Sequence, residues 1–280
     1  MIGKDTIESA IKWCEIGGRW IENGAIRLGL NYLDRAIAVF SEGRNLPWLT
    51  YARHQRLDGL KQAEREDEAV QMFDEVMEGY NRMGDSYGQS LLLAHLAECH
   101  QQQNRGERAM VTLNLASAIA EAEGHNHVQA FIWSQHARLA QERGNLLMAV
   151  RLFRKAEALM EELGEENDSL HLRYYASEAL IKLGERADAI ALLEDLQNRL
   201  LRNMDFQHAL KALNLLSKLY EESGSWDEKN RIAQLTQMCG QNIIRGEGQR
   251  NNPKEGLPLI RPFLEFVPPG SGEVEKQENA

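Results

Sequence analysis

Small and apolar residues recur along this chain at intervals of 40 residues, and one position can be followed through six consecutive repeats. That position is occupied by Gly29, Ala69, Ala109, Ala149, Ala189 and Lys229. Within each repeat the apolar residues follow the spacing of about 3.6 residues that is typical of amphipathic helices. An unbroken period of this length indicates stacked repeats, each of which buries its apolar face against its neighbours.

Each repeat predicts two helices that are separated by a tight turn. In the first repeat Trp13, Ile16 and Trp20 lie on one face of the first helix, and Leu33 lies on the second helix. A small residue marks the place where the two backbones approach closely. This position holds Gly17, Leu57, Ala97, Ala137, Ser177 and Ser217, of which all but Leu57 are small. The turn between the helices holds Gly24, Glu64, Asn104, Gly144, Gly184 and Gly224. The inward apolar position of the second helix holds Leu33, Phe73, Leu113, Phe153, Leu193 and Ala233.

Two short patterns in this period resemble the tetratricopeptide repeat. Residues 13–20 have the sequence WCEIGGRW, which is similar to the opening W-x-x-L-G-x-x-Y of that repeat. Ala69–Phe73 and Ala149–Phe153 resemble its A-x-x-x-F element. The resemblance covers roughly residues 5–245. It implies an all-α fold, a right-handed superhelical solenoid of about six antiparallel helix pairs.

The repeat departs from the usual pattern of that family in two ways. Its period is 40 residues, whereas the common repeat has about 34. The proline that usually closes each repeat is replaced by Ser41, Asn81, Glu121, Glu161 and Leu201. We therefore expect the second helix to continue by about a turn and a half and to end at glycine stops near residues 84, 124 and 164. This is typical of the longer-period subclass, which is found in signalling adaptors and peptide-sensing regulators.

The composition changes after residue 245. Five of the six prolines fall in the last 28 residues, and the helical period cannot continue through them. We expect a repeat array over residues 1–245 and a Pro-rich, largely disordered tail over residues 246–280, with a short apolar segment at 256–269. The apolar side chains of this segment are Leu257, Leu259, Ile260, Phe263, Leu264, Phe266 and Val267. The segment either caps the last helix, docks on another protein or occupies the groove of the array.

The first helices line the concave face in the family that the repeat resembles. Transfer of those positions to this chain gives a candidate groove for a peptide or protein. Its residues are Tyr51, His54, Asp58, Glu98, Gln101, Phe131, Arg138, Gln141, His171, Tyr174, Glu178, Lys211, Asn214 and Lys218. Amide groups there suit the alternating donors and acceptors of an extended peptide, and aromatic side chains supply anchors. The alternative is an ordinary solvated helix face.

Composition and motifs narrow the functional classes. A formal net charge of −10 makes nucleic acid an unexpected partner, because an acidic chain repels phosphates. No segment is apolar for long enough to span a bilayer, and a cytoplasmic location is the expectation. Cys14, Cys99 and Cys239 lie far apart, and we expect them to pack within helices. No catalytic or cofactor motif occurs, and His125 and His127 lack further ligands at metal-site spacing. We therefore expect no enzyme, no cofactor and no metal.

The expected function is a non-enzymatic adaptor or scaffold that binds a peptide or protein segment in its groove. Two alternatives stay open. One is a peptide-sensing regulator, in which a ligand changes the pitch of the superhelix. The other is a chaperone or assembly factor for a secretion or surface-structure machine. A homodimer is compatible with Trp13, Trp20 and Trp226, although ordinary core packing also explains these residues.

Overall fold

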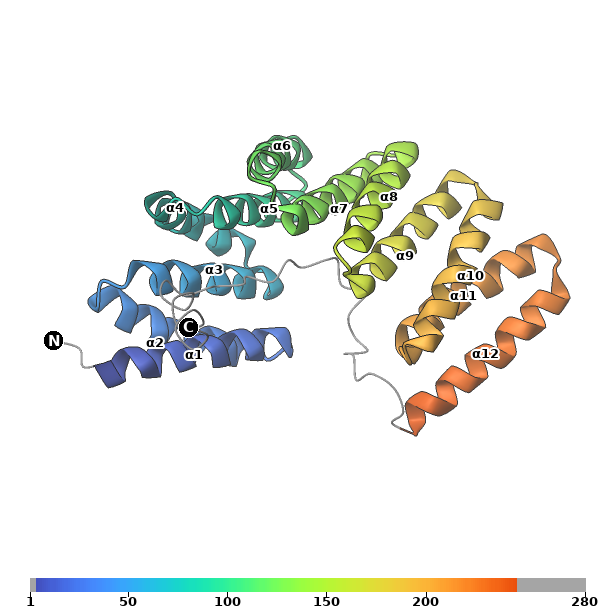
Figure 1. Ribbon diagram of the computed structural model, residues 1–280, viewed down its shortest axis with the longest axis horizontal. Coiled ribbons are helices and arrows are strands. Elements are labelled where there is room, and N and C mark those ends of the chain that lie inside the picture. Colours follow the sequence, from blue (N-terminus) through green and yellow to red (C-terminus); the bar gives the residue numbers. More distant parts are fainter. Residues whose placement is uncertain (1–3, 246–280) are drawn as a thin grey trace, which may run out of the picture. The chain divides into compact units, whose positions relative to one another are not determined.

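The computed structural model describes residues 4–245, which form twelve α-helices in six consecutive antiparallel pairs (Figure 1). The first helices of the pairs are α1 (Lys4–Glu22), α3 (Leu46–Gln62), α5 (Ser86–Gln102), α7 (Asn126–Glu142), α9 (Glu166–Leu183) and α11 (Phe206–Ser223). The second helices are α2 (Ile26–Glu42), α4 (Glu66–Met83), α6 (Gly106–Glu123), α8 (Leu146–Glu162), α10 (Arg186–Arg202) and α12 (Trp226–Ile244). The predicted all-α fold of helix pairs is confirmed.

The helices are spaced more regularly than the 40-residue period requires. From α2 onward a helix begins every 20 residues, at residues 26, 46, 66 and so on to 226. The twelve helices of the described part are 17 to 19 residues long, so that one helix and one short turn together take 20 residues. The second helices continue past the place where a proline was expected, as the sequence predicts. Ser41, Asn81, Glu121, Glu161 and Leu201 all lie within helices.

One residue of each turn has a positive φ angle and lies two positions before the next helix begins. Seven of these residues are glycines: Gly24, Gly84, Gly124, Gly144, Gly164, Gly184 and Gly224. The other four are Arg44, Glu64, Asn104 and Met204, with φ between 51° and 58°. The predicted turns and the predicted glycine stops are therefore confirmed. The four non-glycine residues hold a conformation that costs an L-amino acid about 1–2 kcal/mol.

Met204→Gly is expected to raise the free energy of unfolding by about 0.5–1 kcal/mol, because glycine adopts φ > 0 without the steric cost. The Met204 side chain is exposed, so its removal loses little packing. Gly184→Ala is the matched reverse change. Its new Cβ would meet no atom within 4 Å, and the φ of 91° alone should lower the stability by about 1 kcal/mol. Urea denaturation of both variants checks the pair, and a loss of stability in Met204→Gly would contradict it.

The described residues fall into two compact units, which we call the N-terminal unit (residues 4–128) and the C-terminal unit (residues 129–245). The boundary lies at the start of α7, after Val128. The predicted division into an array and a tail at residue 245 stays a prediction, because residues 246–280 lie outside the described part. The seven predicted tail residues, from Leu257 to Val267, also lie outside the described part.

The core of the N-terminal unit shows why small residues recur. A Cβ added to Gly29 of α2 would lie 2.6 Å from the backbone oxygen of Gly17, and one added to Gly17 would lie 3.0 Å from that of Gly29. The two glycines therefore mark the point where α1 and α2 approach most closely, as predicted. Nearby, the rings of Phe40 and Trp48 stack at 5.8 Å and join α2 to α3.

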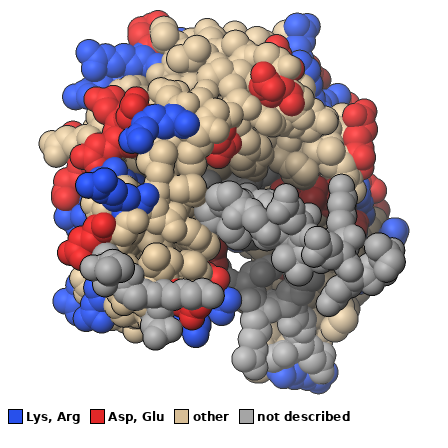
Figure 2. Space-filling view, turned by 60° about the vertical axis from the view of Figure 1, so that its left-hand side comes forward, with Lys and Arg blue, Asp and Glu red and all other residues tan. Residues whose placement is uncertain are grey.

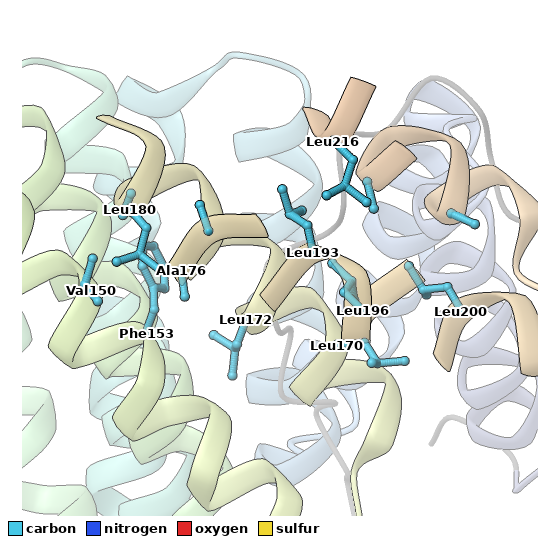
Figure 3. Packing of buried hydrophobic residues seen from close by; sticks show 14 of the residues in the cluster. Val150, Phe153, Leu170, Leu172, Ala176, Leu180, Leu193, Leu196, Leu200 and Leu216 are labelled. Carbon is cyan, nitrogen blue, oxygen red and sulfur yellow. The ribbon is translucent and has the colours of Figure 1, made fainter. Parts of the chain in front are cut away.

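The core of the C-terminal unit repeats this packing with alanine in place of glycine (Figure 3). Ala149 and Ala189 are fully buried at the recurring position, and Phe153 and Leu193 fill the inward apolar position of α8 and α10. Between these two helices lies α9, which contributes Leu170, Leu172, Ala176 and Leu180. Each helix thus buries one face against its sequence neighbours, and the polar positions of the first helices are left to form a surface.

Candidate binding surface on the first helices

A buried lysine links two first helices of the N-terminal unit. Lys61 Nζ lies 2.7 Å from Glu98 Oε2 of α5 and 3.3 Å from Asp58 Oδ1 of its own helix α3. Only 6% of the Lys61 side chain is exposed. Burial by itself lowers the pKa of Lys61, but Glu98 and Asp58 outweigh burial and hold this pKa above its ordinary value. The lysine therefore stays charged, and both carboxylates are engaged within the protein.

A second polar group of the N-terminal unit is fully internal. His54 Nδ1 lies 2.6 Å from the hydroxyl of Tyr80 on α4, and His54 Nε2 lies 3.0 Å from Nδ1 of His95 on α5. The ring of Tyr80 fits because residue 88 is glycine, since a Cβ there would lie 2.2 Å from the ring. Burial, and then the neighbouring His95, lower the pKa of His54 well below its ordinary value. The His54 ring is therefore neutral near pH 7, and its hydrogen bonds join three helices.

A tyrosine and a carboxylate lie together on α9 of the C-terminal unit. Tyr174 and Glu178 are one helical turn apart, both are partly exposed, and their side chains are hydrogen-bonded. Burial, followed by the charge of Glu178, raises the pKa of Tyr174. Burial also raises the pKa of Tyr175, while Arg138 of α7 opposes this rise. The partly exposed Arg138 therefore lies near α9, and the surface across α7 and α9 carries both charge signs.

The start of α11 carries a histidine that is held by its helix cap. Asp205 caps α11 by accepting a hydrogen bond from the backbone N–H of His208, and Asp205 Oδ2 lies 2.5 Å from Nδ1 of His208. The His208 ring contacts the His171 ring of α9 edge to face at 5.3 Å. Burial, and then His208, lower the pKa of His171 to about 4. Lys211 also acts against protonation of His171 and therefore lies close to it.

The structure places the fourteen predicted groove residues at three levels of exposure. His54 and Phe131 are interior, at 0% and 2% exposed, and contribute to packing. Asn214 and Lys218 are exposed on α11. The others are partly exposed: Tyr51, Asp58, Glu98, Gln101, Arg138, Gln141, His171, Tyr174, Glu178 and Lys211. The structure brings together Asp58 with Glu98, Tyr174 with Glu178 and His171 with Lys211, and the role of the whole set in binding stays a prediction.

Sequence reasoning missed Lys61, Asp205 and His208. Gln101 was assigned to the groove, and Lys61 is the equivalent residue one repeat earlier, 40 residues before it. The 40-residue period could therefore have identified Lys61. Asp205 and His208 are visible as an Asp at a helix start, followed by a histidine three positions later. That pattern predicts the cap but not the contact with His171, because the contact joins two different helices.

Charged side chains of both signs occur on the surface. Basic and acidic side chains are interspersed on the face that Figure 2 shows. Within residues 4–245 no helix is long and apolar enough to cross a membrane. The same part of the chain contains no group of three or more His, Cys, Asp or Glu side chains arranged to hold a metal ion. The three cysteines are buried and free of disulfides, as expected.

No known family model and no curated protein sequence matches the chain. Several solved structures are similar to the chain. The signal-transduction ATPase with a tetratricopeptide repeat sensor from Pyrococcus horikoshii has 13% identity and a TM-score of 0.68 over 86% of this chain, which spans 38% of that ATPase. BtubC from P. vanneervenii has 14% identity and a TM-score of 0.64, over 93% of this chain and 98% of BtubC. The Rap protein complexed with Competence and Sporulation Factor has 12% identity and a TM-score of 0.59, over 87% of this chain and 67% of Rap.

The helix pairs and their packing define an α-helical repeat protein. Together with these similarities they show that the chain has the fold of tetratricopeptide-repeat proteins, in the form with a 40-residue period that the sequence predicts. Identities of this size show the fold alone. The function has to be argued from the surface residues.

Proposed function

We propose that the chain is an interaction scaffold that binds an extended peptide or protein segment along the first helices of its C-terminal unit. The proposal rests on one position of the first helices, which recurs every 40 residues. It holds Asp58, Glu98, Arg138, Glu178 and Lys218. The first two share Lys61 and are engaged in ion pairs within the protein. The last three are basic, acidic and basic in turn; Arg138 and Glu178 are partly exposed on α7 and α9, and Lys218 is exposed on α11.

This alternation suggests the chemistry of the partner. Neighbouring packed helices lie about 10 Å apart, and an extended peptide advances about 3.3 Å per residue, so it passes one helix roughly every three residues. A segment with the order acidic-x-x-basic-x-x-acidic would complement Arg138, Glu178 and Lys218. Asn214 adds an amide that can bond to the peptide backbone, and Tyr174 adds an aromatic contact. The similar Rap structure, a complex with Competence and Sporulation Factor, supports a binding role for arrays of this fold.

Selection from a random peptide library on the full chain tests this proposal. We expect enrichment of peptides with acidic residues on both sides of a basic one. Glu178→Lys should replace the central basic preference by an acidic one, because the charge opposite that peptide residue is reversed. Glu162→Lys makes the same change at an exposed site on the second helix α8 and should leave the selection unchanged. Selection without this pattern, or a pattern that Glu178→Lys does not alter, would contradict the proposal.

A further inference from the structure

The outer face of α1 exposes apolar residues, and one of them, Trp20, stands at a position that the other repeats bury. Trp20 is 41% exposed. The residues at its place in the other repeats are at most 9% exposed: Leu60, His100, Ala140, Leu180 and Tyr220. Tyr220 is covered by α10, the second helix of the preceding repeat, since its hydroxyl donates a hydrogen bond to Glu194 of α10 at 2.7 Å. Ile16, one turn before Trp20, is 37% exposed. The described part of the chain has no helix before α1 to cover this face.

A row of exposed charges runs beside the apolar residues of α1. It consists of Glu8, Lys12, Glu15 and Arg19, so the charge alternates in sign along one side of the helix. The positions are symmetric about the midpoint between Trp13 and Cys14. When two copies of α1 are placed antiparallel about that point, Glu8 faces Arg19 and Lys12 faces Glu15 in both directions. The row is therefore complementary to itself.

We propose that two copies of the chain pair through the outer face of α1, in an antiparallel contact that is the same on both sides. Trp13, Ile16 and Trp20 supply the apolar area that is removed from water, and the charged row sets the orientation of the two helices. Exposed ion pairs contribute little free energy by themselves, so the aromatic residues dominate the affinity. One helix per copy gives a small interface, and the dimer is accordingly reversible and its population rises with concentration.

Sedimentation velocity of the full chain over a concentration series tests the contact. We expect a species with the mass of two 31.8-kDa chains to grow with concentration. Trp20→Glu should weaken this association by about tenfold or more. Trp226→Glu is the matched control, because this tryptophan is 59% exposed on α12. It should leave the association unchanged. A chain that stays monomeric at every concentration overturns the proposal; this would be the result if residues 246–280 covered the face. A dimer that Trp226→Glu disrupts and Trp20→Glu leaves intact overturns it as well.

A charge-swap experiment tests the antiparallel alignment. Lys12→Glu places two acidic residues opposite each other in a homodimer, and Glu15→Lys places two basic residues there. Each variant alone should therefore associate more weakly than the parent chain. Mixed in equal amounts, the two variants should associate again, because residue 12 of each then faces residue 15 of opposite charge. A change in the stability of α1 alone would not be reversed by mixing. Failure of the mixture to associate, or full association of either variant alone, overturns the alignment.

Discussion

Replacement of Glu98 by Gln is expected to lower the free energy of unfolding by about 2–3 kcal/mol. The substitution keeps the shape of the side chain but leaves the Lys61 ammonium buried with Asp58 alone, at 3.3 Å. Breaking a fully buried ion pair from one side costs about 3–5 kcal/mol, and the partial exposure of Glu98 places the expected loss below that range. Urea denaturation followed by circular dichroism measures the effect.

Three further variants show whether the loss comes from breaking the Lys61–Glu98 pair. Lys61→Met alone and Lys61→Met combined with Glu98→Gln complete a double-mutant cycle, and the double variant should be more stable than the sum of the single losses predicts. Glu221→Gln breaks the exposed pair with Lys229, where the two side chains are 58% and 27% exposed, and it should cost less than about 1 kcal/mol. Strict additivity of the double variant would contradict the role assigned to Lys61.

Acidification from pH 7 to pH 4 is expected to destabilise the chain through its buried histidines. The pKa values of His54, His100, His136 and His171 are all lowered, chiefly by burial. The unfolded chain therefore binds protons near pH 6.5 that the folded chain does not bind until lower pH, and stability falls as the pH drops below 6.5. For His171, whose folded pKa is about 4, the loss reaches roughly 3 kcal/mol at pH 4.

Urea midpoints measured between pH 7 and pH 4 check this expectation. His171→Asn should flatten the dependence, since the variant no longer binds that proton when it unfolds. His127→Asn, at an exposed histidine at the start of α7, is the control and should follow the parent chain. A parent chain whose stability does not change over this range would show that the interior histidines accept protons without cost to the fold.

The fold could be predicted from the sequence because the same packing problem recurs. Gly29, Ala109 and Ala189 occupy equivalent places where two helices meet, and each place admits only a small residue. The turns at residues 44 and 204 could not be predicted from the sequence, because Arg44 and Met204 adopt a conformation that normally requires glycine. At these two turns the lengths of the flanking helices, and not the local residue, set the backbone.

For the candidate surface, the sequence predicts which positions take part but not the exposure or the contacts of their side chains. The period shows that residues 51, 131, 171 and 211 share one place on the first helices, but they are Tyr, Phe, His and Lys. The phenylalanine is buried, whereas the others reach solvent. The partners of His54 and Glu98 come from other helices, and their counterparts in the next repeat differ in chemistry. The 40-residue period therefore predicts where a side chain lies on its helix. It does not predict the contacts of that side chain, because the contacting pairs of residues differ from repeat to repeat.

The closely packed helices within a unit are one or two places apart along the chain. The contacts that stabilise each unit therefore join residues that are near in sequence, and forming them closes only short loops. Within residues 4–245 no segment distant in sequence packs against α1. A terminal helix such as α1 can detach while the interior helices stay folded. We expect backbone amide hydrogens of α1 to exchange with solvent sooner than those of α3, and any molecule that covers α1 will slow that exchange.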